Sequence, residues 1–347
     1  MLAALSNHAL ATVAATATPH APFRIERVLP GSQAEADGLQ PGDQLLAIDH
    51  VTAQQAGGEP QFLALALGQA GQPLTLTLQR PGVPTPVEIT TTRELVSYPL
   101  EQHQVLLGTI GYVDFEGFAA GAAAVDALRA ALTELSAAGV SGWILDLRLS
   151  TGRSLSTLQR VAGVFLPPDT PVATTRGVEG GPTALGSMGT PLVDQKPLVV
   201  MIGPGTVAAA EVLAQTLHDA GRATVVGSQS AGCVNDGPRY GLLDGGGVVI
   251  SATAVYAGAS QTPLEDAGVS PDVAVARSEA DLAAGRDPQL DAALALLGQV
   301  VPLPERAAIG TDARVSGLTT ASSSGLGARR GVVGGAGVSW WPGPPRR

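Results

Sequence analysis

Apolar and polar positions alternate with period two along the first part of this chain. LLAIDH (45–50), LTLTLQR (74–80) and VEITTTR (87–93) each alternate in this way, and Gly/Pro-rich turns separate them. Such runs predict β-strands with one buried face. FRIERVLPG (23–31) predicts a further strand that ends at a Pro-Gly turn. The pattern therefore predicts a compact, β-rich module over residues 23–93.

Two short helices are expected inside this module. Ser32 and Glu35 have the spacing of a capping box, in which the serine hydroxyl and the glutamate carboxylate satisfy backbone amides at a helix start. Gly38 and Pro41 keep this helix short. A second helix is expected around residues 61–67.

From Val105 onward, nearly continuous apolar runs alternate with helical periodicity. Such runs are typical of strands in a sheet that is covered on both faces. The predicted strands cover 109–115, 143–148, 197–202, 223–227 and 247–257, and the predicted helices cover 121–139, 154–166, 206–220 and 289–300. We therefore expect a mixed α/β core over 105–300, so that the fold class is α+β or α/β with a β-rich module in front.

The two ends of the chain differ from these parts. Residues 1–22 are mildly apolar but lack the basic residues that open a signal peptide, so they are expected to be a disordered segment or the remnant of a signal. Residues 301–347 are rich in Gly, Ser and Arg, which predicts a disordered tail. A shifted reading frame would also produce this abrupt change. No run of about 18 apolar residues occurs, and we expect no membrane-spanning helix.

Charge and cysteine content exclude several classes of function. The net charge of −10 argues against nucleic acid or an anionic membrane surface as a partner. The single cysteine, Cys233, excludes an internal disulfide and a multi-cysteine metal site. The five histidines are scattered and form no HExxH pair, so we expect neither a bound metal nor another cofactor.

Several stretches resemble two known families. VLPGSQAEADGLQPGDQLLAIDH (28–50) is similar to a bacterial PDZ domain. Four later stretches resemble, in the same order, segments of the C-terminal processing, or tail-specific, serine proteases. They are LGTIGYVDFEGF (107–118), WILDLR (143–148), PLVVMIGPGTVAAAEVLAQTLHDAGRATVVGSQSAG (197–232) and AGVSPDVAV (267–275). The resemblance covers about residues 23–300. It implies a serine-type peptidase core behind a PDZ domain, with a location outside the cytoplasm.

The same resemblance assigns the catalytic positions. In that family the nucleophilic serine lies three residues before a glutamate, and counting back from Glu211 gives Ala208. The general-base lysine of the family falls at Cys233, and the glutamine that orients it falls at Gly237. All three side chains of the family's site are therefore replaced. Three changes favour natural divergence, since a deliberate inactivation needs only one.

The resemblance also assigns the amides that bind the carbonyl oxygen of a substrate. One is the amide of Ala209, which follows the nucleophile position, and the other lies in a loop that has paired glycines in the family. In LDLRLSTGRS the first of these glycines is Gly152, and Arg153 replaces the second. We expect this loop to be stiffer and more crowded than in the family.

The substitutions imply a catalytically impaired protein that binds peptides or unfolded C-terminal segments in the old cleft. A serine hydroxyl attacks a carbonyl only when a base removes its proton, and an alanine methyl has no atom to attack with. The alternative is an active peptidase that uses substitutes: Cys233 with His218 as base, or Ser228 or Ser230. A decayed gene product without activity is a third interpretation.

Two further interpretations concern single segments. Taken alone, GPGTVAAAE (203–211) reads as an ordinary helix start with Thr206 as its N-cap. In the first module, the PDZ resemblance implies that peptides or unfolded protein C-termini are the partners.

Four residues are assigned to peptide binding on this basis: Phe23, Ile25, Leu39 and Leu65. TATPHAP, which precedes Phe23, has no glycine of the kind that captures a terminal carboxylate. The remaining way for the module to bind a peptide is to add it to the sheet as an extra strand.

Overall fold

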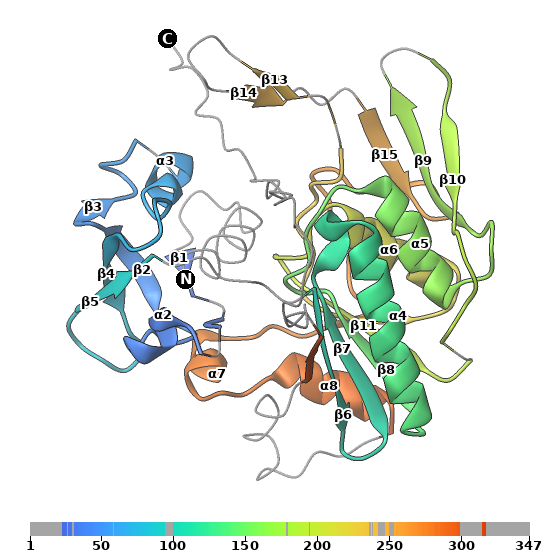
Figure 1. The fold of residues 1–347 in the computed structure, drawn as a ribbon, viewed down its shortest axis with the longest axis horizontal. Helices are drawn as coiled ribbons and strands as arrows, with labels where there is room; N and C mark the ends of the chain where they lie inside the picture. Colours follow the sequence, from blue (N-terminus) through green and yellow to red (C-terminus); the bar gives the residue numbers. More distant parts are fainter. Residues whose placement is uncertain are drawn as a thin grey trace, which may run out of the picture.

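The fold places a small β-rich module beside a larger α/β core (Figure 1). The structure is a computed structural model that describes residues 23–25, 27–29, 31–57, 59–93, 100–177, 180–193, 195–235, 237, 239–241, 247–249, 253–298 and 314–316. Strands β1–β5 form the sheet of the module, and the core is built on a seven-stranded sheet. The mixed α/β class with a PDZ-like module in front is thus confirmed.

The module is a twisted sheet with two short helices. Its elements are β1 (Phe23–Arg24), α2 (Gln33–Ala36), β2 (Gln44–Ile48), β3 (Val51–Thr52), α3 (Glu59–Ala64), β4 (Pro73–Gln79) and β5 (Val87–Thr92). The strand order is β1-β2-β4-β5, with β3 paired to β2. Leu74, Leu76 and Leu78 alternate along β4 and are fully buried, as the period-two pattern predicts.

The capping box of α2 is present, but one of its two hydrogen bonds has a different donor from the expected one. The Ser32 hydroxyl accepts a hydrogen bond from the Glu35 amide at 3.3 Å. The Glu35 carboxylate accepts from the Gly31 amide at 2.6 Å, one residue before the expected position. The first predicted strand is shorter than 23–31, because pairing with β2 stops after Arg24.

The core sheet has the order β17-β12-β11-β8-β7-β6-β18. Its strands are β6 (Glu101–Leu106), β7 (Ile110–Phe115), β8 (Gly142–Asp146), β11 (Leu198–Ile202), β12 (Thr224–Gly227), β17 (Val273–Ala274) and β18 (Arg314–Ser316). Strands β7, β8, β11 and β12 run parallel. Their C-terminal ends therefore share one edge, where ligands of open α/β sheets usually bind.

Helices cover both faces of this sheet (Figure 1). On one face lie α4 (Ala122–Ala137), α5 (Leu155–Phe165) and α6 (Ala209–Asp219), packed on the inward residues of β7, β8 and β11. On the other face lies α8 (Pro288–Leu296), packed on Ile144, Val199 and Met201. Burial on both faces explains the continuous apolar runs of these strands.

A second, antiparallel sheet flanks the core. Its order is β10-β9-β15-β16, formed by β9 (Pro171–Gly177), β10 (Thr183–Gly186), β15 (Thr253–Ala257) and β16 (Thr262–Pro263). Short elements complete the description: the 3-10 turn η1 (Gly117–Ala120), the hairpin of β13 (Arg239–Gly241) and β14 (Gly247–Val249), and α7 (Glu279–Ala283). The long strand predicted over 247–257 is wrong, because β14 and β15 belong to different sheets.

The ends of the chain fall mostly outside the described residues. Residues 1–22 lie outside them entirely. Within the predicted tail, Arg314–Ser316 form β18 and pair with β6, where disorder was expected. Among the described residues, no helix has the length and apolar character needed to cross a bilayer.

Arg27 joins the module to the core. Its guanidinium donates to Asp114 on β7 with an Nη1–Oδ2 distance of 2.7 Å, and it also contacts Glu116. Asp114 pairs in register with Asp146 of β8, whose carboxylate is held by Arg148 at 2.6 Å. Burial raises the pKa of Asp114 to about 6, although Arg27 opposes the rise. A mostly buried cluster of two arginines and several carboxylates thus lies at the contact between the two parts.

This cluster predicts a pH dependence of stability. Because the pKa of Asp114 is higher in the folded chain than in the unfolded one, the folded state binds more protons between about pH 4 and 6. The free energy of unfolding therefore falls as pH rises through this window, by up to about 3 kcal/mol for a shift of two pKa units. Urea titrations at pH 4, 5, 6 and 7 measure this fall. Asp114→Asn is expected to make the fall smaller by the share of Asp114, whereas Glu116, whose pKa burial also raises, keeps its own share.

The matched control is Asp126→Asn, since Asp126 lies exposed on α4. This variant should keep the slope of the parent chain. An equal slope in Asp114→Asn and the parent would show that Asp114 does not carry the effect.

Candidate functional site

The turn between β11 and α6 is built by backbone contacts that the sequence only partly predicts. Thr206 is fully buried, and its hydroxyl donates to the Leu147 carbonyl at 2.8 Å and accepts from the Gly203 amide at 3.0 Å. Thr206 therefore closes the turn and is not the N-cap of α6. That part of the prediction is wrong: the N-cap residue is Ala208.

Ala208 has a backbone conformation that alanine rarely adopts. Its φ is 58° and its ψ is −113°, and its side chain is buried. Holding such a conformation costs about 1–3 kcal/mol, so the surrounding structure must impose it. Hydrolases mount nucleophiles on strained strand-to-helix turns of this kind. Here the turn presents a methyl group.

A buried carboxylate connects this turn to the segment that carries Cys233. Glu211 accepts hydrogen bonds from the Ala208 amide (3.0 Å), the Gly232 amide (2.6 Å), the Cys233 amide (3.0 Å) and the Ser230 hydroxyl (2.6 Å). The amides of Ala208 and Cys233 share the same oxygen, Oε2. Positions 208 and 233 are therefore neighbours. Burial raises the pKa of the Glu211 carboxyl, and these hydrogen bonds limit the rise.

The thiol of Cys233 lies in a poor environment for a nucleophile. Burial raises its pKa, and Arg153, whose Nη2 lies 3.4 Å from Sγ, opposes the rise only in part. The reactive form of a cysteine is the thiolate, and a raised pKa reduces it. His218 lies in the last turn of α6 and contacts Asp272 at 3.1 Å, about 15 Å along the helix from Ala208. The structure does not bring the proposed base His218 to Cys233.

The two serines of the same region make structural hydrogen bonds. Ser230 donates to Glu211 and accepts from the Val269 amide at 2.7 Å. Ser228 donates to the Val275 carbonyl at 3.2 Å. Both hydroxyl protons are committed to buried or backbone acceptors. Gly237, at the position of the orienting glutamine, has no side chain to hold a base.

The two residues assigned to the carbonyl-binding amides contact each other. The Ala209 amide donates to the Gly152 carbonyl at 3.0 Å, and the Val207 amide donates to the Ser150 carbonyl at 3.0 Å. Gly152 has a φ of 132°, and a Cβ there would lie 2.7 Å from the Cβ of Phe118. The resemblance predicted that these residues are neighbours. It did not predict this orientation, in which the Gly152 carbonyl takes up the hydrogen bond of the Ala209 amide.

The residues assigned to peptide binding lie in and around the core of the module. Ile25 and Leu39 are only 2% and 4% exposed, and they pack inside it. Phe23 and Leu65 are half-buried at its edge, with the Phe23 ring centroid 5.0 Å from that of Phe62. β1 is an end strand of the sheet order. Phe23 and Leu65 are therefore the more accessible pair, and peptide binding stays a prediction.

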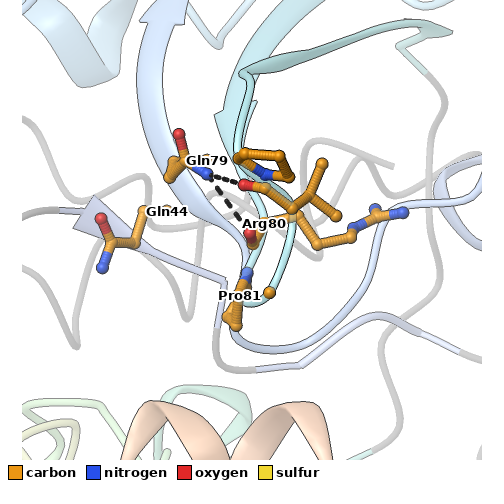
Figure 2. Close-up of a pocket in the computed structure, with 7 residues that line it drawn as sticks. Gln44, Gln79, Arg80 and Pro81 are labelled. Carbon is orange, nitrogen blue, oxygen red and sulfur yellow. Dashed lines mark hydrogen bonds between the residues drawn. The ribbon is translucent and has the colours of Figure 1, made fainter.

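A pocket of about 540 Å³ lies elsewhere on the module, lined by Gln44, Gln79 and residues 80–84 (Figure 2). The Gln79 amide donates to the carbonyls of Arg80 (3.3 Å) and Val83 (2.6 Å), which Figure 2 shows as dashed lines. The Arg80 guanidinium is held by Asp43 at 2.8 Å. These groups stabilise the turn after β4, and the pocket includes no residue of the turn at Ala208.

Within the described ranges, no group of three or more His, Cys, Asp or Glu residues is arranged to hold a metal ion. The described residues around Ala208 form a strained turn, a buried carboxylate and a neighbouring loop.

Comparisons with known proteins identify the family of the chain. Residues 109–275 match the sequence model of peptidase family S41, and residues 24–80 match that of a PDZ domain. The chain is 34% identical over 278 residues to the carboxyl-terminal-processing protease of Synechocystis sp., and 31% identical over 279 residues to that of Picosynechococcus sp.. Both alignments cover 78% of this chain, and they cover 63% and 66% of the relatives, so the chain spans just under two thirds of their length.

The fold is similar to that of a solved relative. The photosystem II D1 C-terminal processing protease superposes with a TM-score of 0.57 at 25% identity, over 73% of this chain and 68% of that one. A putative S41 protease from Bacteroides fragilis gives the same TM-score at 22% identity, which supports the fold. With its peptidase core at 109–275 behind a PDZ domain, the chain belongs to peptidase family S41.

Proposed function

We propose that this chain is a catalytically impaired member of the C-terminal processing peptidases that binds peptides or unfolded protein C-termini in the former cleft. One observation carries the proposal. Ala208 keeps the strained backbone of a nucleophile turn, and it carries a methyl group in place of a hydroxyl. Without an attacking atom, turnover falls to the level that binding and amide contacts alone provide.

The surroundings of the turn support retained binding. The Glu211 network joins Ala208 to Cys233 with four hydrogen bonds, and its carboxylate is fully buried. A buried carboxylate is tolerated only when such donors satisfy it. This network around the turn at Ala208 supports a binding protein over a decayed gene product. A location outside the cytoplasm is part of the same proposal and rests on the family alone.

The test measures hydrolysis and binding on one preparation. The substrates are an unstructured protein and a fluorescent peptide with an apolar C-terminus. We expect no new peptide termini by mass spectrometry and saturable binding by fluorescence anisotropy. Hydrolysis that disappears in Cys233→Ala would support the active alternative through the thiol. Hydrolysis that persists in Cys233→Ala would reject both the impaired interpretation and the cysteine route.

A further inference from the structure

We infer that residues 150–153, here called the strap, block the carbonyl-binding amide of Ala209 with a carbonyl of their own. We further infer that the Arg153 side chain, here called the latch, holds the strap in this position. The inference rests on the proposed function, because it concerns how a peptide gains access to the same cleft. The strap lies between the end of β8 and the start of α5.

Two backbone hydrogen bonds attach the strap to the turn. The carbonyls of Ser150 and Gly152 accept from the amides of Val207 and Ala209, each at 3.0 Å. Amides at the start of a helix have no partner within the helix, and they are the groups that bind a carbonyl oxygen or an anion. Here the chain supplies its own carbonyl to Ala209. A peptide carbonyl can reach this amide only after the Gly152 carbonyl has left it.

The packing of Gly152 keeps the carbonyl in place. Its φ of 132° is accessible almost only to glycine, and η1 presses on it from the other side. A Cβ at this position would lie 2.8 Å from the Ala119 amide nitrogen. The strap therefore rests against η1 on one side and against the start of α6 on the other.

Arg153 fastens the strap to the opposite wall. Its guanidinium donates to the Asn235 carbonyl and lies 3.4 Å from the Cys233 sulfur. That wall is itself fixed, since the Glu265 carboxylate accepts from the amides of Val234 (2.9 Å) and Asn235 (2.8 Å). The Arg153 side chain, which stands where the family has a glycine, thus bridges two loops across the former site.

The experiment compares Arg153→Ala with Arg160→Ala, a matched change at an exposed position of α5. Hydrogen exchange of the Ala209 amide is measured in both variants, with the amides of the last turn of α6 as an internal reference. We expect exchange at Ala209 to rise about tenfold in Arg153→Ala, with the reference unchanged. Binding of the fluorescent peptide is expected to tighten about threefold or more in the same variant, because the peptide no longer competes with the latched strap.

The outcomes separate the strap from the proposed function. Equal exchange at Ala209 in the two variants overturns the strap. Faster exchange with weaker or unchanged peptide binding overturns the competition between strap and peptide. Faster exchange with no peptide binding in the parent or in either variant supports the strap and rejects the proposed peptide-binding function.

Discussion

Hydrolysis of an apolar-tailed peptide is expected to appear when Ala208→Ser and Cys233→Lys are combined. The two positions are neighbours, because their amides share one oxygen of Glu211. A serine at 208 would take over a backbone that already has the strained φ of 58°. A lysine at 233 would be half-buried, as Cys233 is, and burial lowers the pKa of an amine so that it can act as a base. We expect kcat/KM about a hundredfold above the parent chain.

The single variants are the controls for this restoration. Ala208→Ser alone lacks a base, and Cys233→Lys alone lacks a nucleophile, so each should remain at the parent level. Adding Arg153→Gly to the double variant should raise kcat further, since it removes the latch beside the lysine. A folded double variant that binds peptide but does not hydrolyse it would contradict this prediction and would show that Arg153 and Gly237 also prevent catalysis.

Replacing Glu211 by glutamine is expected to destabilise the protein by about 3 kcal/mol or more. The carboxylate accepts from four donors, whereas a glutamine side chain has one acceptor oxygen and an NH2 group that only donates. At least one buried amide therefore loses its partner, and a lost hydrogen bond to a buried charge costs more than an ordinary one. Urea unfolding monitored by circular dichroism measures the loss.

A second measurement shows where the loss occurs. The rate at which Cys233 reacts with a disulfide reagent in the absence of denaturant should rise in Glu211→Gln, because the segment with Gly232 and Cys233 loses its anchor. The matched control is Glu88→Gln, since the Glu88 side chain is 59% exposed. Equal stability of Glu211→Gln and Glu88→Gln would show that the Glu211 network does not hold the site together.

Sequence pattern predicted the centre of the core sheet and missed its flanks. β8 and β11 are buried on both faces, so their apolar runs are unambiguous. β6 is different, because its buried side chains include Glu101 and His103, whose Oε2 and Nδ1 atoms lie 2.9 Å apart. A polar pair of this kind hides a buried strand from any search for apolar runs. β9 and β10 were missed as well, because their exposed residues break the apolar pattern.

The site was predictable in position but not in detail. The family resemblance placed Ala208 next to Cys233 and Gly152 next to Ala209, and the contacts at Glu211 and at Gly152 agree with this. Spacing does not give the direction of a peptide plane, so the sequence could not show that the Gly152 carbonyl faces the Ala209 amide. It also gave no sign that Arg27 connects the module to β7, since the partners are 87 residues apart.

The wall that receives Arg153 depends on Glu265, which holds the amides of Val234 and Asn235. During synthesis, the cleft therefore stays incomplete until Glu265 has emerged from the ribosome. The pairing partners of β1–β5, by contrast, all lie within the first 92 residues. The contact between Arg153 and Asn235 also spans 82 residues. Contacts of such separation form late, because the entropy of closing the intervening loop must be overcome first. A nascent chain of this protein would thus carry a folded module well before it carries a cleft, and no product truncated ahead of position 265 would possess one.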